Sequence, residues 1–553
     1  MKGRVLIVGG AGVFGRRLAE GLRSTTDVEI ILAGRTLFRV RSAAHAVGAS
    51  FAALDRAQSS AAEISALAPS VVVDASGPFQ GADYRFARAV IEAGAHYVDL
   101  ADARDFVAGF GALDDLAKVR GRAAITGASS TPALTHAALD TVCAGWRRVD
   151  SVVAGIAPGN RAPRGRSLVE AILKRAGAPT RVFDHGVWID WPGWRHYSVI
   201  HVEGLGRRRF AIVETPDLDL VPARFATLDR AVFLAGLELS VLQRGIEAIG
   251  ALRHWRVWRS PERWAAAFTL AARLVEPLGS DNGAMFVEAL GRDASDRPCS
   301  ALWTLLAPAG QGPYAPTLPA LATIRKLLVE DVPPGARACV GLLSLTDFAS
   351  DFERVGLKSG IGRELLRSPF ERALGQGFEV APRAVREAHR SGPVTRLVGE
   401  AAVAGAGTFL AEFVASSIGF PCAASAAPVR VVKRQLGDGR EIWLRHIGGR
   451  TFKSVLSCPA PGIVRERFGP FEFDMKVTAT ETCLTMEVVG WRLGPLPLPK
   501  ALAPRSLAKE SATGDGRFQF DVPIDAPLLG RLTHYRGALR LETPAQDVKE
   551  SAA

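Results

Sequence analysis

A glycine-rich turn near the N-terminus constrains this chain more than any other feature. The run RVLIVGGAGVFGRRLAEGL begins at Arg4 and joins an apolar stretch, a glycine cluster and an amphipathic stretch. Gly10, Gly12 and Gly15 fit the spacing G-x-G-x-x-G, which alone is a weak signal. Its context is stronger, because the glycines directly follow a predicted strand (5–8) and open a predicted helix (16–24).

This spacing meets the needs of a pyrophosphate-binding turn. Gly10 allows the tight turn, Gly12 lets the backbone approach the phosphates, and Gly15 lets the helix pack on the strand. The helix N-terminus then offers free N–H groups and a positive dipole end to the anion. The alternative is a glycine turn without a ligand. We predict that a dinucleotide lies against Gly10, Ala11, Gly12, Val13, Phe14 and Gly15.

The first 140 residues alternate short apolar runs with amphipathic ones. Strands are expected at 5–8, 29–33, 71–74, 97–100 and 123–126, and helices at 16–24, 61–68, 84–93 and 112–118. Such alternation indicates right-handed βαβ crossovers and a parallel sheet. We therefore predict an α/β fold whose residues 1–140 form a Rossmann doubly wound parallel sheet.

The end of the second strand indicates which dinucleotide is bound. It reads EIILAGRT, so Gly34 stands where an acidic residue would hold the ribose of NAD, and Arg35 follows. A guanidinium suits a 2′-phosphate, so the sequence favours NADP(H), with NAD(H) as the alternative. Asp55, at the end of FAALD, either meets the adenine edge or is an ordinary turn residue.

Small and polar residues end the next three strands. Ser76, Gly77, Pro78 and Phe79 follow VVVDA and are expected to line the nicotinamide end of the groove, because ligands lie beyond the carboxyl ends of parallel strands. Three side chains farther along are weak candidates for proton transfer. These catalytic candidates are Tyr97, Asp99 and Ser130.

After residue 140 the pattern changes twice. Residues 141–360 mix strands (149–156, 195–203), helices (231–252, 261–274) and a hairpin with its turn at 291–297, as an α+β substrate domain would. Residues 356–375 are linker-like. Residues 372–542 begin with helices up to Phe420 and continue as a β-rich module, and the tail 543–553 is expected to be disordered.

Composition excludes several classes of function. The net charge is +12, but no run of five basic residues occurs, which argues against nucleic-acid binding. Six scattered cysteines form no metal-binding pattern, so we expect no metal and reduced thiols in a cytoplasmic protein. The segment 401–420 is apolar but contains Glu412, which favours a buried or surface-lying helix over a membrane span. Peripheral membrane association and a homodimer stay open.

Together the motifs resemble the saccharopine dehydrogenase-like oxidoreductases. The similarity runs from VLIVGGAGVFGRRLA through VVVDASGPFQGADYRFARAVIEAGAHYVDLADARDF to TGASSTPALT, and more faintly through SDNGAMFVEALGRD and GQGPYAPTLPALATIRKLL. It implies a Rossmann domain and an α/β domain with the substrate between them, and hydride transfer between NAD(P) and a C–N centre. Saccharopine-forming members often carry Gly-Glu after the YvDl strand, whereas this chain has Ala101-Asp102, which puts an amino-acid substrate in doubt.

The C-terminal module resembles a bacterial domain of unknown function, DUF4166. The matching pieces include GFPCAASAAPVRVV, EIWLRHIGGRTFKS and FQFDVPIDAPLLGRLTHYRGAL. The resemblance implies no chemistry. Two interpretations are open for Trp443, Arg445, Phe468 and Trp491, the lining of an apolar pocket or the core and its rim, and we favour the core. Two hypotheses follow. The first is an NADP(H)-dependent oxidoreductase acting on a small-molecule substrate, with a C-terminal module that shapes or delivers a hydrophobic one. The second is a non-catalytic nucleotide-sensing or lipid-associated binding protein.

Overall fold

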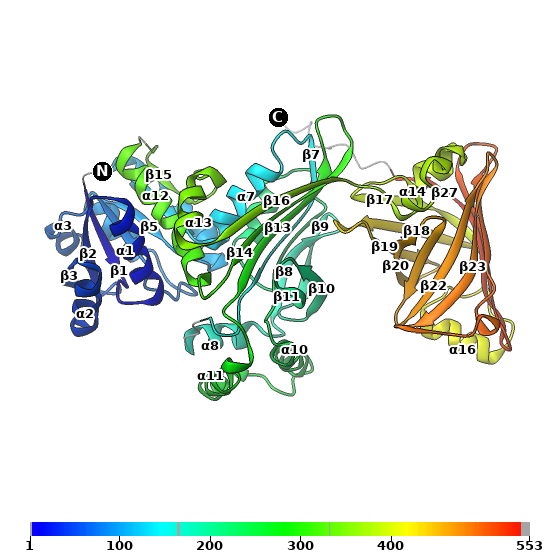
Figure 1. Cartoon of the computed structure of the whole chain (residues 1–553), viewed down its shortest axis with the longest axis horizontal. Helices are drawn as coiled ribbons and strands as arrows, with labels where there is room; N and C mark the ends of the chain where they lie inside the picture. The colour runs from blue at the N-terminus through cyan, green and yellow to red at the C-terminus, as the bar shows by residue number, and fades with distance from the viewer. Residues whose placement is uncertain (1–2, 163–165, 331, 543–553) are drawn as a thin grey trace. The chain divides into compact units, whose positions relative to one another are not determined.

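A computed structural model describes residues 3–162, 166–330 and 332–542 (Figure 1). The chain divides into two compact units, the first built mainly from residues up to 362 and the second mainly from residues 363 onward. The first unit contains a parallel sheet and most of a mixed sheet, and the second is built around an antiparallel barrel. The predicted fold class is confirmed.

The first sheet has seven strands in the order β15-β6-β5-β4-β1-β2-β3, and the neighbouring strands run parallel. Apolar side chains on β1, β4 and β5 are fully buried, as expected for strands covered on both faces. The strands are β1 Arg4–Val8, β2 Glu29–Gly34, β3 Ser50–Ala53, β4 Val71–Asp74, β5 His96–Asp99, β6 Ala123–Thr126 and β15 Gly335–Ala338. The helices between them are α1 Val13–Thr25, α2 Leu37–Val47, α3 Ala61–Ala66, α4 Arg85–Glu92, α5 Arg104–Gly109 and α6 Asp114–Val119.

The parallel sheet is not confined to the first 140 residues. Strand β15 returns from far along the chain and pairs with β6, Gly335 opposite Ala123 and Ala338 opposite Thr126. No local pattern predicts this strand, because GARA is short and carries no apolar run. Asp114 fixes it by accepting a hydrogen bond from the Ala336 N–H at 2.9 Å.

The second sheet is mixed. Its order is β10-β11-β12-β7-β13-β14-β16, with β8 paired to β12 and β9 paired to β8. The predicted hairpin is present as β13 and β14. The strands are β7 Arg148–Ala157, β8 Pro179–Asp184, β9 Val187–Pro192, β10 His196–Val202, β11 Gly206–Ile212, β12 Arg230–Ala235, β13 Gly283–Arg292, β14 Pro298–Ala307 and β16 Lys358–Leu365. The helices of this part are α7 Thr135–Val142, α8 Arg166–Arg175, α9 Asp217–Arg224, α10 Ser240–His254, α11 Ala265–Leu274, α12 Leu318–Val329 and α13 Ala349–Val355.

Two predictions for this region are wrong. The expected helix at 231–252 is a strand, β12, followed by helix α10. The residues AVFLA that follow Arg230 are all apolar and fit either period, and pairing between β7 and β11 decides for the strand. Residues 356–375 are not a linker, because they form β16 and helix α14 (Pro369–Leu374).

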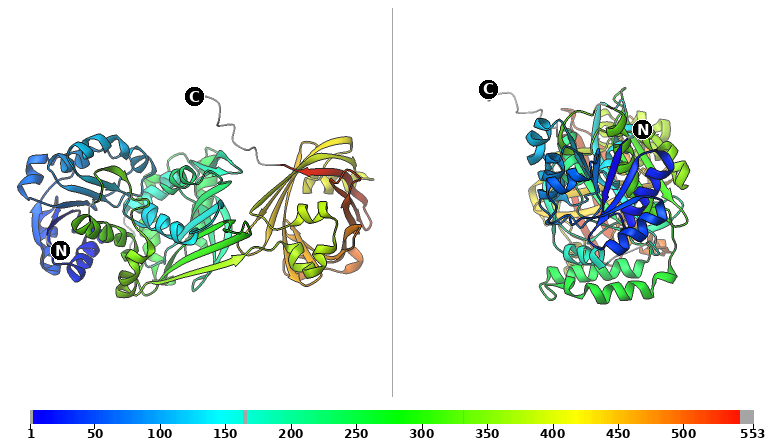
Figure 2. Two further views of the ribbon diagram at one scale, coloured as in Figure 1. Left: turned by 90° about the horizontal axis from the view of Figure 1, so that it is seen from above. Right: turned by 90° about the vertical axis from the view of Figure 1, so that its left-hand side faces the viewer.

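The C-terminal strands close into an antiparallel barrel, which Figures 1 and 2 show as a wrapped sheet. Strands follow in the order β22-β21-β20-β19-β18-β17-β27-β26-β25-β23, and β22 also pairs with β23, so no open edge remains in this ring. The strands are β17 Val394–Ala404, β18 Ala424–Gln435, β19 Glu441–Ile447, β20 Arg450–Ala460, β21 Ile463–Phe468, β22 Phe471–Ala479, β23 Cys483–Leu493, β24 Leu496–Pro497, β25 Leu507–Ala512, β26 Phe518–Ala526 and β27 Gly530–Leu541. The predicted β-rich module is confirmed, whereas the tail 543–553 lies outside the described residues.

The segment 401–420 is not the single helix that we expected. Its first residues end strand β17, and helix α16 occupies only Phe409–Ile418. Thr408 caps that helix by accepting a hydrogen bond from the Ala411 N–H at 3.2 Å, and Gly419 ends it in a left-handed conformation. Across the described residues, no helix combines the length and apolar character that crossing a bilayer requires.

The barrel encloses charged side chains as well as apolar ones. Lys433 on β18 is 4% exposed, and its ammonium donates to the Ala388 carbonyl at 2.7 Å and lies 3.8 Å from the Trp443 ring centroid. His389 on α15 (Arg383–His389) contacts Glu510 at 2.5 Å. Burial lowers the pKa of Lys433 to about 8. Trp443 and Arg445 are buried in this interior, as the core interpretation predicted.

Candidate functional site

The site is built where the strand order of the parallel sheet reverses. Strand β1 lies between β2 and β4, so the chain moves to one side of β1 with β2 and β3 and to the other side with β4 and β5. Parallel sheets of this kind bind ligands at this point, beyond the carboxyl ends of the strands. The glycine turn occupies this point. The N–H groups of Gly9 and Gly10 both donate to the Ala33 carbonyl on β2, at 2.9 and 3.2 Å, which fixes the turn against the sheet.

Three glycines of the turn are required by packing. A Cβ on Gly15 would lie 2.5 Å from the Gly9 carbonyl oxygen, and one on Gly10 would lie 2.8 Å from the Leu32 Cβ. Gly9 has a φ of +79° and lies against the Ala75 backbone. The motif analysis missed Gly9, although the Gly-Gly pair at the strand end was a signal for it.

Gly12 differs from these three. A Cβ there would meet a single protein atom, the Gly9 carbonyl oxygen at 3.1 Å, and the residue is exposed. Gly12 is also the N-cap of α1, where no side chain caps the helix and no acidic residue stands in the first turn. The space in front of Gly12 and the dipole end of α1 are therefore free for an anion, which fits a bound pyrophosphate.

Apolar side chains surround this open helix end. Val13 is 45% exposed and Phe14 is 41% exposed, although both begin a helix whose other face is fully buried. Ala11 is exposed as well. The six residues expected at the turn therefore form the end of the loop after β1 and the first turn of α1.

Free positive charge lies at the end of β2. Arg35 is exposed and directly follows the half-buried Gly34, and no ion pair holds it within the described chain. Arg39, in the first turn of α2, is likewise exposed and was missed by the sequence analysis. The signal for it was the basic spacing in GRTLFR. Two guanidinium groups at this strand end suit a phosphate.

Asp55 lies in the turn after β3, and its contact with the adenine edge stays a prediction. Its carboxylate accepts a hydrogen bond from the Ala57 N–H at 3.0 Å. The next residue, Arg56, is the one that reaches the centre of the sheet, because it forms a 2.8 Å ion pair with the fully buried Asp74. Burial raises the pKa of Asp74, and Arg56 opposes that rise. The sequence reasoning missed this pair, although an aspartate that ends the run VVVD was a visible signal.

The turn after β4 divides into an accessible part and a buried part. The Ser76 hydroxyl donates to Asp74 at 2.5 Å, and Gly77 and Pro78 are exposed. Phe79 does not line the groove as expected. Its ring is 4% exposed and packs on the Phe106 ring with centroids 5.3 Å apart, because the turn directs it back into the core.

The three candidate catalytic residues are placed differently. Tyr97 and Asp99 on β5 are buried, 1% and 0% exposed, while Ser130 is half-buried at the start of a turn of π-helix. Asp99 accepts hydrogen bonds from the N–H groups of Gly127 and Ala101, at 2.7 and 3.0 Å, and so ties the ends of two strands together. Of the three, Ser130 is the one that is not fully buried.

Burial gives Asp99 a measurable pH signature. It raises the pKa of this carboxyl from 3.8 to about 7, so the folded protein holds a proton that the unfolded chain releases. Below the pKa that Asp99 has in the unfolded chain, this protonation therefore contributes up to about 4 kcal/mol to the free energy of unfolding. The contribution falls as the pH rises and is lost near pH 7.

Asp99→Asn should remove this dependence, because an amide oxygen can accept the same hydrogen bonds without titrating. We expect the difference in unfolding free energy between the parent protein and Asp99→Asn to fall as pH rises from about 5 to about 8. Urea denaturation across this range measures it. A constant difference would show that Asp99 does not change protonation there.

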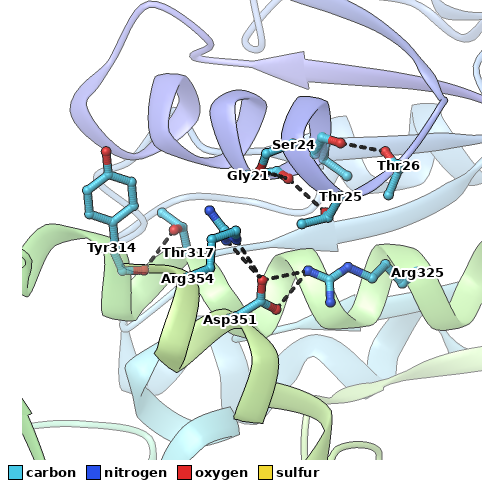
Figure 3. Close-up of polar contacts among 10 residues, drawn as sticks. Gly21, Ser24, Thr25, Thr26, Tyr314, Thr317, Arg325, Asp351 and Arg354 are labelled. Atoms are coloured by element: carbon cyan, nitrogen blue, oxygen red, sulfur yellow. Dashed lines mark hydrogen bonds and ion pairs between the residues drawn. The ribbon is translucent and has the colours of Figure 1, made fainter. Parts of the chain in front are cut away.

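Residues between β14 and β15 brace helix α1. The Tyr314 hydroxyl, in the turn Gly312–Thr317, donates to Glu20 at 3.2 Å. Leu321 of α12 packs against Gly21, where a Cβ would lie 3.1 Å from the leucine methyl. Figure 3 shows this segment running beside α1. Helix α1, which begins at the glycine turn, is thus held by residues that lie outside the predicted nucleotide-binding segment 1–140.

A buried carboxylate holds the bracing segment together. Asp351 on α13 is 1% exposed and accepts two hydrogen bonds from Arg325 on α12, at 2.7 and 2.9 Å. Arg354 contacts the same carboxylate at 2.9 Å (Figure 3). A buried carboxylate with two guanidinium partners fixes α12 against α13.

Comparison with known proteins finds a family match for two segments of the chain. Residues 5–133 match the family described as the saccharopine dehydrogenase NADP binding domain, and residues 382–539 match the domain of unknown function DUF4166. No curated protein is similar enough in sequence to count as a relative.

Solved structures share part of the architecture. Saccharopine dehydrogenase (L-Glu forming) from Saccharomyces cerevisiae is 12% identical, and the match covers 66% of this chain and 100% of that one with a TM-score of 0.50. GenD2 from gentamicin A biosynthesis, in complex with NAD, is 16% identical over 54% of this chain and 72% of that one, with a TM-score of 0.28. The first similarity shows a shared fold. Within this chain, residues 5–133 are thus similar to the saccharopine dehydrogenase NADP binding domain and residues 382–539 to the DUF4166 domain.

Proposed function

We propose that this protein is an NADP(H)-dependent oxidoreductase of the saccharopine dehydrogenase-like type. The observation that carries the proposal is the open end of α1. Gly12 is exposed and has no side chain, the helix is uncapped, and Gly10 and Gly15 are fixed by packing behind it. These are the features a dinucleotide pyrophosphate needs, and the family match over 5–133 supports the same interpretation.

Each part of the site has a separate task in this proposal. The glycine turn holds the pyrophosphate, and Arg35 with Arg39 holds the 2′-phosphate. When bound, the nicotinamide supplies or accepts a hydride. The exposed turn Gly77-Pro78 borders the reacting end, and the Ser130 hydroxyl is the accessible group for orienting a substrate or relaying a proton. Asp99 and Asp74 act as positioning residues for the strand ends.

Cofactor titration tests the proposal directly. Fluorescence titration with NADPH should show saturable binding, and a panel of carbonyl, imine and enoyl compounds should include one that oxidises NADPH. If neither nicotinamide cofactor binds, the proposal is overturned. If NADPH binds and no compound of the panel is reduced, the non-catalytic nucleotide-sensing function is favoured instead.

The choice between the two cofactors should depend on Arg35. Arg35→Asp places a carboxylate where a 2′-phosphate would lie, so the affinity for NADPH should fall by about 10- to 100-fold, while NADH binding should be retained or improved. Arg88→Asp is the matched control, because Arg88 is exposed on α4 outside the crevice. An unchanged ratio of the two affinities in Arg35→Asp would contradict the role given to Arg35.

A further inference from the structure

An exposed apolar surface lies on the first unit, away from the glycine turn in sequence. Figure 1 shows α8, α10 and α11 grouped together. We define the α10–α11 surface by exposed residues between the end of α10 and the turn after α11. It consists of Trp255, Arg256, Val257, Arg259, Arg263, Trp264, Leu270, Arg273, Leu274 and Leu278.

The apolar members of this surface are unusually open to solvent. Trp255 is 71% exposed, Val257 72%, Leu274 75% and Leu278 73%. The opposite side of the same segment is already packed, because Trp258 and Phe268 join the buried cluster beneath α8 and α10. The outward side chains are therefore not needed for the core. Large exposed apolar patches of this kind mark interaction sites.

Positive charge is interleaved with these apolar side chains. Arg253, Arg256 and Arg259 line an open depression of about 330 Å³. Arg256, Arg259, Arg263 and Arg273 form no ion pair with any residue that the structure describes. The stretch 252–278 carries five arginines and two glutamates, Glu262 and Glu276, so the surface is basic. Its charge is complementary to an anionic partner.

The mixture of side chains selects the kind of anionic partner. Tryptophan rings favour the headgroup level of a bilayer, and leucines beside them favour the acyl boundary below it. Arginines at the same level bind lipid phosphates bidentately. A single-stranded nucleic acid would stack on the two tryptophans but would leave Leu270, Leu274 and Leu278 uncovered.

We propose that the α10–α11 surface docks onto an anionic phospholipid membrane, with the depression between Arg253, Arg256 and Arg259 receiving a lipid phosphate. The apolar side chains enter the interface, and no helix spans the bilayer. This peripheral docking does not rest on the proposed function, because none of its residues belongs to the glycine turn or to the crevice. It would place the enzyme at a surface where water-insoluble molecules reside.

Vesicle flotation with the full chain tests the proposal. The protein should float with vesicles of phosphatidylcholine and phosphatidylglycerol in equal amounts, should not float with phosphatidylcholine alone, and should be released by raised salt. Arg256→Glu/Arg259→Glu should weaken binding by more than about tenfold, since each basic residue near such a surface contributes about 1 kcal/mol. Trp255→Ser/Leu274→Ser should weaken it at all salt concentrations.

Two control variants distinguish the α10–α11 surface from other exposed parts of the chain. Arg120→Glu/Arg450→Glu makes the same change in net charge at exposed arginines elsewhere, and Phe409→Ser/Phe413→Ser removes the exposed apolar face of α16, where Phe409 is 84% exposed. Both should bind anionic vesicles as the parent does, and all four variants should keep their NADPH affinity. The proposal is overturned if the parent fails to float with anionic vesicles at low salt, if either control loses binding equally, or if single-stranded RNA competes fully with the vesicles.

Discussion

Gly12→Val should reduce NADPH affinity by at least about 100-fold while the protein stays folded. A valine side chain would occupy the space in front of the α1 N-terminus and keep the phosphates from its N–H groups, and two lost hydrogen bonds to a charged group cost about 3 kcal/mol or more. The backbone can accept the change, since Gly12 has a φ of −76° and a Cβ there meets one protein atom. Fluorescence titration of NADPH measures the affinity, and thermal unfolding measures the stability.

Two other glycine variants serve as comparisons for this result. Gly111→Val is the matched control, because Gly111 is exposed and has nothing within 4 Å of an added Cβ, so NADPH affinity should not change. Gly15→Ala should behave in the opposite way to Gly12→Val and destabilise the protein, since its Cβ would lie 2.5 Å from the Gly9 carbonyl oxygen. If Gly12→Val binds NADPH as the parent does, the phosphates do not lie at this turn.

Lys433→Ala should destabilise the C-terminal barrel by about 3–5 kcal/mol, which is typical when one partner of a buried charged cluster is removed. The ammonium is the cation that faces Glu441 and Glu510 inside the barrel, and it also satisfies the Ala388 carbonyl. Without it, two buried carboxyls lose their counter-charge. Guanidinium denaturation followed by tryptophan fluorescence measures the loss, because Trp443 lies directly against Lys433.

Lys476→Ala is the control for this variant. Lys476 is exposed on β22 of the same barrel, so its truncation should change the unfolding free energy by less than about 0.5 kcal/mol. Lys433→Met separates charge from packing, because it keeps most of the buried volume. If Lys433→Met and the parent protein unfold at the same denaturant concentration, the charge of Lys433 does not hold the barrel together.

Local sequence patterns predicted much of the segment 1–140. The strand, turn and helix around Gly10, Gly12 and Gly15 were predicted because their period and glycine spacing are local properties of the chain. The exposure of Arg35 also follows from the local sequence, because a residue directly after a buried strand reaches solvent. This exposure agrees with its proposed role. The hairpin around 291–297 was found from the turn residues between its apolar runs.

Partners distant in sequence could not be predicted. Arg56, in the loop after β3, meets Asp74 at the end of β4 although β1 and β2 lie between these two strands in the sheet, and neither residue lies in a motif with the other. Phe79 was expected in the groove, and only the course of its turn shows that the ring enters the core. The run RAVFLA was assigned to a helix because an unbroken apolar run has no period to read.

The sequence by itself determined the glycine turn, the class of cofactor to test, the α/β alternation and the β-rich character of the last third. These depend on spacing and periodicity, which neighbouring residues carry. Tertiary structure decided the return of β15 to the parallel sheet, the bracing of α1 by residues after 311, and the closure of β22 on β23 into a barrel. Tertiary structure also decided that the tryptophans and arginines of the α10–α11 surface are exposed to solvent. Whether a side chain is buried depends on how segments distant in the sequence pack into the same core, and a local sequence pattern does not contain this information.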